Sequence, residues 1–241
     1  MASEGALLSK IDSTVGRINS KTTELQNSIN STLSASWLGI PEWVKDKVRD
    51  GWNTFTRFLK DLWDTLAEIL TNMGSPSKLF STGDSWSNSV GGPVSQQVQH
   101  AEAGSLAVDD NWDGTAATAY KQALPLQKTA LEKIKSTFTD GISQALSDVA
   151  KAIYVFWGAL IVALGALVAG IIAAIASTAT ILGLPAGPFI AAAAVLAAIA
   201  ACTAGGLNLK SAASAANSSL RQKINDNVGY RDGHWPKATT S

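Results

Sequence analysis

Charged side chains are missing from one long part of this 241-residue chain. Residues 152–209 contain no Asp, Glu, Lys, Arg or His, and all 19 basic and 19 acidic residues lie outside them. The stretch from Ile153 to Ile175 contains 12 Ile, Leu, Val or Phe residues and has no hydrophilic face. A helix that is apolar on every side belongs in lipid or at the centre of other helices. The absence of charge therefore excludes an ordinary surface helix over these residues.

Cysteine and histidine are also scarce. Cys202 is the only cysteine, which excludes an intrachain disulfide and a cysteine-based zinc site. The two histidines, His100 and His234, have no metal-ligand or catalytic-triad spacing with Cys, Asp or Glu. Strand patterns and a glycine-rich phosphate loop are missing as well. We therefore expect no enzymatic activity, no metal site and no cofactor.

The number and distribution of charged residues limit the partners that the chain can have. The net charge of zero argues against a nucleic-acid partner. Residues 75–150 have five basic and eight acidic residues, a sum of −3, whereas residues 210–241 have five basic and two acidic, a sum of +3. The C-terminal segment can therefore pair with the middle of the chain or with anionic lipid. Residues 1–13 have no apolar core of signal-peptide length, so we expect any export to use another route.

The uncharged stretch predicts a membrane-capable helical hairpin. As a helix, residues 152–176 would be about 37 Å long, enough to cross a hydrocarbon core of about 30 Å. Membrane insertion is favoured by roughly 6 kcal/mol for this half and by roughly 2.5 kcal/mol for residues 189–202. Residues 177–188 contain the glycines and prolines of a turn. The residues that define this hairpin are Phe156, Trp157, Gly158, Gly165, Gly170, Pro185 and Pro188.

Amphipathic helices are predicted for the rest of the chain. Apolar residues at spacings of three and four run through residues 8–33, where they form a heptad seam, and through residues 41–73. Residues 76–108 are a weaker helical segment with a break at Gly91-Gly92-Pro93, and a helix from about residue 126 should continue to 176. We expect an all-α bundle of tandem helical hairpins with an added hydrophobic hairpin. Its predicted parts are residues 1–74, 75–150, 151–206 and 207–241.

The most informative short motif is Trp112-Asp113-Gly114. The matching residues after it are Thr115, Ala116, Ala117, Ala119, Tyr120, Leu124, Pro125, Gln127, Ala130 and Leu131, with Pro76, Leu79 and Trp86 upstream. This pattern resembles the WxG family of type VII (ESX) secretion substrates over about residues 75–150. The resemblance implies a helical hairpin that turns at Trp112 and Gly114 and packs Tyr120 in a bundle. It also implies pairing with a second hairpin and export by a membrane ATPase complex.

The family's export signal, Tyr-x-x-x-Asp/Glu after the hairpin, has no counterpart in this chain. Four residues beyond its three tyrosines stand Leu124, Gly158 and His234. By the resemblance, either a partner subunit supplies the signal or the chain is not exported.

A second W-x-G group stands 75 residues earlier, at Trp37-Leu38-Gly39. Helical segments of about 30 residues flank both groups. We therefore predict a second turn at Trp37 and Gly39. We also expect residues 1–74 and 75–150 to form, within one chain, the four-helix bundle that WxG proteins form as dimers.

The favoured function is that of a non-enzymatic type VII secreted protein that inserts its hairpin into a membrane, as a pore- or conduit-forming oligomer. The expected partners are membrane lipid, further copies or a WxG-type helical partner, and the type VII secretion machinery. The expected location is outside the cell or in the cell envelope, at a membrane. One alternative is a soluble secreted structural or interaction protein with the hairpin buried in a bundle or homo-oligomer. Another is a plain membrane anchor with Lys151 and Lys210 on one cytoplasmic side.

Overall fold

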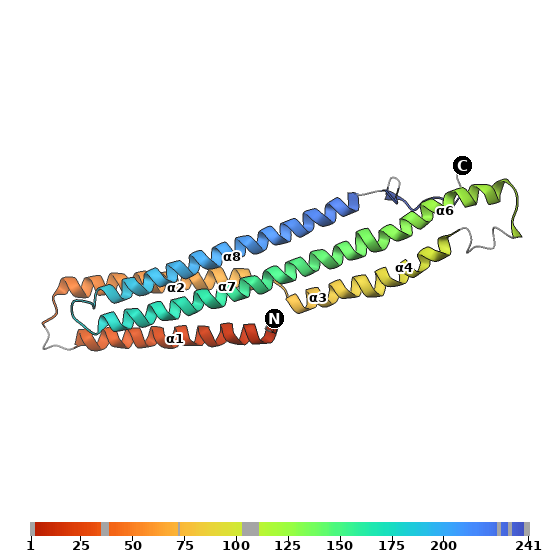
Figure 1. Ribbon diagram of the computed structural model, residues 1–241. Helices are drawn as coiled ribbons and strands as arrows, with labels where there is room; N and C mark the ends of the chain where they lie inside the picture. Colours follow the sequence, from red (N-terminus) through yellow and green to blue (C-terminus); the bar gives the residue numbers. More distant parts are fainter. Residues whose placement is uncertain are drawn as a thin grey trace. The chain divides into compact units, whose positions relative to one another are not determined.

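The computed structural model describes residues 3–34, 39–71, 73–102, 111–225, 228–230 and 233–238. These residues are 88% helical, include four long helices and contain no strand, which confirms the all-α bundle. The helical elements are α1 (Glu4–Ser34), α2 (Glu42–Thr71), α3 (Pro76–Ser85), η2 (Trp86–Gly91), α4 (Gly92–Gln97), η3 (Val98–Ala101), α6 (Thr115–Lys133), η5 (Ile134–Thr139), α7 (Asp140–Thr178) and α8 (Ala186–Asn225) (Figure 1).

The chain forms two compact units. Unit 1 contains Met1–Gly74 and Ala152–Lys210, and unit 2 contains Ser75–Lys151 and Ser211–Ser241. The expected bundle of residues 1–74 with residues 75–150 is therefore wrong, because residues 1–74 associate with the apolar hairpin instead. The hairpin offers the two amphipathic stripes of α1 and α2 a long apolar surface, and burial of that surface is the main favourable contribution to folding.

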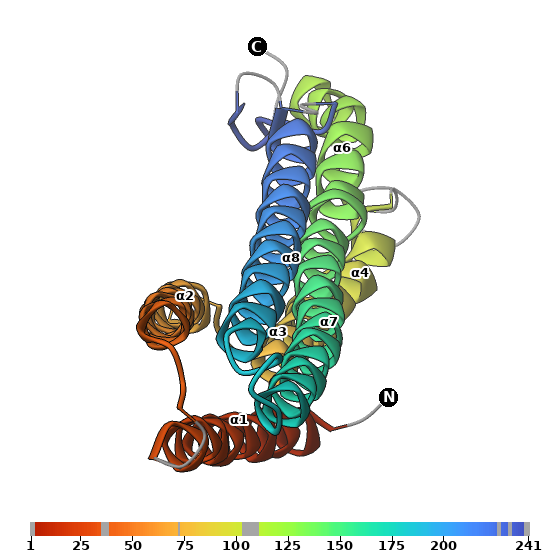
Figure 2. The same cartoon turned by 90° about the vertical axis from the view of Figure 1, so that its left-hand side faces the viewer.

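Unit 1 pairs each amphipathic helix with one helix of the hairpin. Ser28 on α1 lies against Thr178 at the end of α7, with 2.8 Å between their hydroxyl oxygens. Gly51 on α2 lies against Pro188 on α8. Ile69 lies against Gly206, and each of these residues stands 18 positions after its counterpart in the first pair. Figure 2, in which the hairpin turn faces the viewer, shows α1 beside α7 and α2 beside α8. The hairpin is therefore covered by α1 and α2 along one side.

The apolar stripes predicted for α1 and α2 form the covering surface. Their buried side chains recur at spacings of four and seven, as a helix face requires. They are Ile11, Ile18, Leu25 and Ile29 on α1, and Val44, Val48, Phe55, Leu62 and Leu66 on α2.

Unit 2 is a second helical hairpin, in which two π-helical segments, η2 and η5, face each other. A Cβ at Gly91 would collide with Thr139 Oγ1, so the missing side chain permits this close approach. Ser87 donates a hydrogen bond to Asp140 (3.0 Å), which also pairs with Lys135 (3.1 Å). The expected break at Gly91-Gly92-Pro93 is wrong: the backbone stays helical from η2 into α4.

Two long helices continue through positions where the sequence alone does not show whether a helix ends. A continuous helix from Thr115 to Thr178 confirms the prediction that residues 126–176 form one helix. The helix α8 also continues through Gly205-Gly206, where we expected one part of the chain to end. A Cβ built on Gly205 would lie 2.9 Å from the Phe156 ring. The glycine therefore allows α8 to pack closely on α7 and does not mark a turn.

Candidate functional site

The turn of the apolar hairpin is short and closed by its own backbone. The helix α7 ends at Thr178 and α8 begins at Ala186. The amide of Leu184 donates to the Thr180 carbonyl (2.8 Å), and the amide of Gly183 donates to the Thr180 hydroxyl (3.1 Å). Pro185 lies in the turn and Pro188 in the first turn of α8, where a missing amide hydrogen costs nothing. The turn contains no charged residue.

One face of the hairpin is buried. On α7 the buried residues include Phe156 and Trp157, each 3% exposed, and on α8 they include Ala191, Ala192 and Ala198. The buried set on the two helices is Ile153, Phe156, Trp157, Leu160, Ala163, Leu164, Leu167, Val168, Ile171, Ala174, Ala191, Ala192, Val195, Ala198 and Cys202. These positions recur every three or four residues, so each arm is buried along a single stripe, by the other arm and by α1 and α2.

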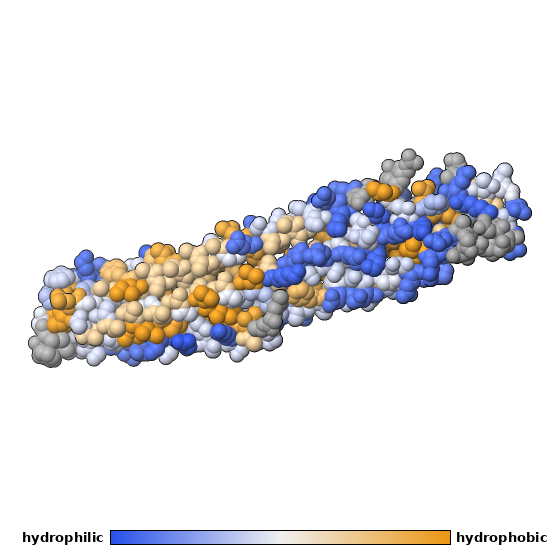
Figure 3. All heavy atoms as spheres, in the orientation of Figure 1, coloured by the Kyte–Doolittle hydropathy of each residue, from blue (hydrophilic) through white to orange (hydrophobic). Residues whose placement is uncertain are grey.

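The opposite face of the hairpin is open. Val155 and Val162 are each 72% exposed on α7, and Leu196 is 52% exposed on α8. The most apolar 18-residue windows of the two helices are only 33% and 28% buried. Figure 3 shows hydrophobic residues gathered over α7 and α8 in unit 1. The described residues of unit 1 therefore do not enclose its most apolar segment.

The hairpin tip carries the most exposed large apolar residue. Leu182 is 94% exposed, whereas Leu184, two residues later, is fully buried. Phe189 at the start of α8 is also 43% exposed. The end of the hairpin thus presents uncharged, partly apolar groups to solvent.

The three glycines of α7 that help to define the hairpin, Gly158, Gly165 and Gly170, differ in role. A Cβ at Gly170 would collide with the Ala194 Cβ, so Gly170 does permit close contact between α7 and α8. Among the described residues, no atom lies within 4 Å of a Cβ added at Gly158 or Gly165, and both glycines lie towards the open face. Sequence reasoning missed Gly187, which packs against Thr178. Only knowledge of the register between α7 and α8 would have identified it.

Polar groups at the tip tie the cover to the hairpin. Thr178 is fully buried, and its hydroxyl lies 2.8 Å from both the Ser28 hydroxyl and the Ile175 carbonyl oxygen. The Thr32 hydroxyl donates to the Thr178 carbonyl (3.2 Å). No sequence pattern indicated these contacts, since Ser and Thr are common throughout α1.

Two buried polar atoms of unit 1 have no hydrogen-bond partner among the described residues. They are the Thr22 hydroxyl oxygen on α1 and the Trp157 indole nitrogen on α7. A buried polar atom without a partner costs about 1–3 kcal/mol. Both atoms therefore weaken the covered arrangement.

The Trp112 motif lies where α6 begins. Gly114 has φ of +106°, a conformation that favours glycine, and its carbonyl accepts hydrogen bonds from the amide and the hydroxyl of Thr118 (3.1 Å each). The rings of Trp112 and Tyr120 lie 5.8 Å apart, and Trp112 is 42% exposed. The structure thus brings Trp112, Gly114 and Tyr120 together at the end of the unit 2 hairpin.

The second turn motif is only partly described. Trp37 lies outside the described residues. Gly39 has φ of +57°, which again favours glycine.

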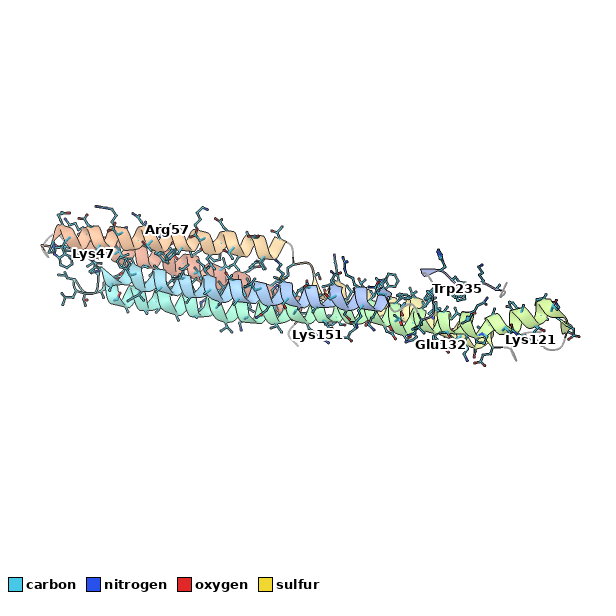
Figure 4. The ribbon with its side chains drawn as sticks, turned by 90° about the horizontal axis from the view of Figure 1, so that it is seen from above. Lys47, Arg57, Lys121, Glu132, Lys151 and Trp235 are labelled. Carbon is cyan, nitrogen blue, oxygen red and sulfur yellow. The ribbon has the colours of Figure 1, made fainter. Side chains whose placement is uncertain are left out.

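Charged groups of α1 and α2 lie on the outer surfaces of these helices. Figure 4 shows the Arg57 side chain pointing away from the hairpin. The hydrogen bond from Lys45 (2.7 Å) lowers the pKa of the Glu42 carboxyl, and the one to Asp64 (2.5 Å) raises the pKa of the Lys60 ammonium. Such exposed pairs contribute little to stability.

In unit 2 the C-terminal segment packs on α6. The Tyr230 hydroxyl donates to the Ala130 carbonyl (2.9 Å), and its ring contacts those of Phe138 and Trp235. Burial raises the pKa of Tyr230 above 10.0. Among the described residues no cluster of His, Cys, Asp and Glu can hold a metal ion.

Two helices of the described chain are long and apolar enough to cross a membrane, judged by length and composition, and they are the two arms of the hairpin. Comparisons with protein-family models, curated proteins and solved structures give no match.

Proposed function

We propose that this protein is a non-enzymatic, membrane-inserting protein whose active element is the apolar hairpin. The observation that carries the proposal is a charge-free hairpin of membrane-spanning length with one face left open by the described residues of unit 1. An open apolar face of this length marks a protein or membrane contact, because soluble monomers rarely expose one.

The mechanism is a shift between two forms. In the water-soluble form α1 and α2 cover one side of the hairpin. In the membrane form the hairpin leaves this cover and crosses the bilayer with its turn in front. Lipid replaces the apolar contacts that the cover made, so the exchange needs no charged group to enter the hydrocarbon. A bilayer favours the second form because it binds only that form.

Oligomer formation would use the open face. Gly158, Gly165 and their alanine neighbours leave that side of α7 flat, and small residues let membrane helices approach closely. Contacts between copies along this face would give a pore or conduit.

Export by a type VII system is the second part of the proposal. It is supported by the resemblance over residues 75–150 and by the turn at Trp112 and Gly114 beside Tyr120. A WxG-type helical partner would supply the missing export signal. Co-expression with a candidate partner and a type VII system tests this: the protein should reach the medium only when both are present. Export without them, or retention with them, would contradict it.

Membrane insertion is tested by dye release from lipid vesicles with Leu182→Asp. Because Leu182 is 94% exposed, the substitution leaves the covered form intact but puts a charge on the leading turn. A charged side chain at a bilayer centre costs about 3 kcal/mol, so dye release should fall about a hundredfold. The matched control is Leu126→Asp in unit 2, where Leu126 is 54% exposed, and it should release dye like the unmodified protein. Equal release by both variants would exclude tip-first insertion.

A water-soluble oligomer is the competing function. The 72% exposure of Val155 and Val162 favours some partner on that face even in water. Sedimentation without detergent separates the two: a stable oligomer that leaves vesicles intact would favour the soluble structural protein.

A further inference from the structure

Trp157 stands apart from the other tryptophans of the chain. It is the only one of the eight within the charge-free stretch, and it lies six residues after Lys151. In the covered form it is 3% exposed, its ring meets the Tyr154 ring edge-on at 5.8 Å, and its indole nitrogen has no acceptor among the described residues. Packing alone does not explain an indole here, because a phenyl ring would fill apolar space without burying a donor.

The position of Trp157 along the hairpin suggests where that donor is satisfied. From Trp157 to Thr178 the helix α7 advances about 32 Å, close to the thickness of a hydrocarbon core of about 30 Å. On α8 the same rise separates Ala186 from Leu207, three residues before Lys210. If the turn crosses the bilayer, Trp157 lies at the near boundary between hydrocarbon and headgroups.

That boundary suits an indole. Its ring remains in an apolar layer while its N–H reaches the ester carbonyls of lipid or interfacial water, which is why Trp and Tyr are enriched there. The donor that is buried without a partner in the covered form would thus gain one in the bilayer. Lys151 and Lys210 would remain in water on the near side.

We propose that Trp157, together with Tyr154, is a lipid-interface anchor that sets how deeply the hairpin inserts, a proposal that rests on the proposed membrane insertion. Its partner is the carbonyl and water layer of a phospholipid bilayer. The anchor favours insertion for two reasons. The indole N–H is no longer buried without a partner, as it is in the covered form, and it gains a hydrogen-bond acceptor in the membrane.

The test measures depth and extent of insertion separately. In a Cys202→Ala background, a fluorescent NBD label is attached to a cysteine at Val155 or Val162, two exposed sites that leave the cover undisturbed. Vesicles of phosphatidylcholine and phosphatidylglycerol with quenchers at known depths report where each label lies. We expect the label at 155 at the interface and the label at 162 within the hydrocarbon.

The variants Trp157→Phe and Trp157→Tyr separate the donor from the ring. Trp157→Phe should reduce vesicle binding about tenfold or let the 155 label move deeper, because one hydrogen bond and one unsatisfied donor are removed. Trp157→Tyr keeps an interfacial donor and should restore binding and depth. Trp235→Phe in unit 2 is the control and should change neither. Circular dichroism in water verifies that every variant keeps its helices.

The results of this experiment distinguish failure of the anchor from failure of membrane insertion. Normal depth and binding of Trp157→Phe, or a 155 label at the bilayer centre in the unmodified protein, would overturn the anchor while membrane insertion stands. Failure of the unmodified protein to bind vesicles would refute the proposed function and the anchor with it.

Discussion

A disulfide between α1 and α7 should hold the protein in its covered form. The hydroxyl oxygens of Ser28 and Thr178 are 2.8 Å apart, so cysteines at these positions bring their sulfur atoms within reach of a bond. The double variant Ser28→Cys/Thr178→Cys is made with Cys202→Ala to leave no third thiol. When oxidised, it ties α1 to the tip of the hairpin, and the turn can cross a bilayer only by taking a polar helix with it.

The size of the effect follows from the separation of the two residues in the chain. They are 150 positions apart, and closing a loop of that length in a fully flexible chain removes about 5 kcal/mol of entropy. Because the helices of the open form stay folded, this value is the upper limit, and the open population should fall by at most about several thousandfold. Replacing the two hydroxyls removes their hydrogen bond and destabilises the covered form by about 1 kcal/mol. The reduced variant should therefore insert slightly more readily than the parent.

Dye release from vesicles, with and without reductant, measures this prediction. The oxidised variant should release no dye, and added reductant should restore dye release within minutes. Ser28→Cys and Thr178→Cys alone are the controls, and reductant should not affect them. Equal release by the oxidised and reduced forms would show that the hairpin inserts without leaving α1.

Three further outcomes follow from packing and charge. Gly170→Val should destabilise the contact with Ala194 and lower the melting temperature, whereas Gly165→Ala, with open space around it, should be neutral or slightly stabilising. Leu62→Ala, at a fully buried site on the cover, should cost about 3 kcal/mol in urea unfolding and increase vesicle binding. Burial raises the pKa of Tyr230, so its contribution to stability is present below pH 10.0 and is lost as pH rises through the higher folded pKa. Trp emission should report release of the C-terminal segment there, and Tyr230→Phe should remove this pH dependence.

Periodicity and charge predicted the elements of this fold. The seam through Ile11, Ile18 and Leu25 is buried as expected, and the uncharged stretch folds as a hairpin. These features are local, because a helix face and a turn are encoded by residues close together in the sequence.

The pairing of the helices could not be predicted in the same way. An amphipathic stripe shows that a helix needs a partner but does not identify the partner. Residues 1–74 therefore suited both the middle hairpin and the apolar one. The part of the chain predicted to end at residue 206 continues as helix for a related reason, since a glycine that admits the Phe156 ring and a glycine that ends a helix are identical in sequence. The contacts of Thr178 depend on the same unknown register.

The most direct test of the account asks whether the hairpin turn crosses a bilayer. A fluorescein label is attached to Leu182→Cys in the Cys202→Ala background, the protein is mixed with vesicles, and an antibody that quenches fluorescein is then added outside. Because an antibody is too large to pass through the bilayer or through a pore formed by the hairpins, the account predicts that the label on bound protein keeps its fluorescence until detergent is added. Immediate loss of fluorescence, as fast as for the protein in water, would contradict it.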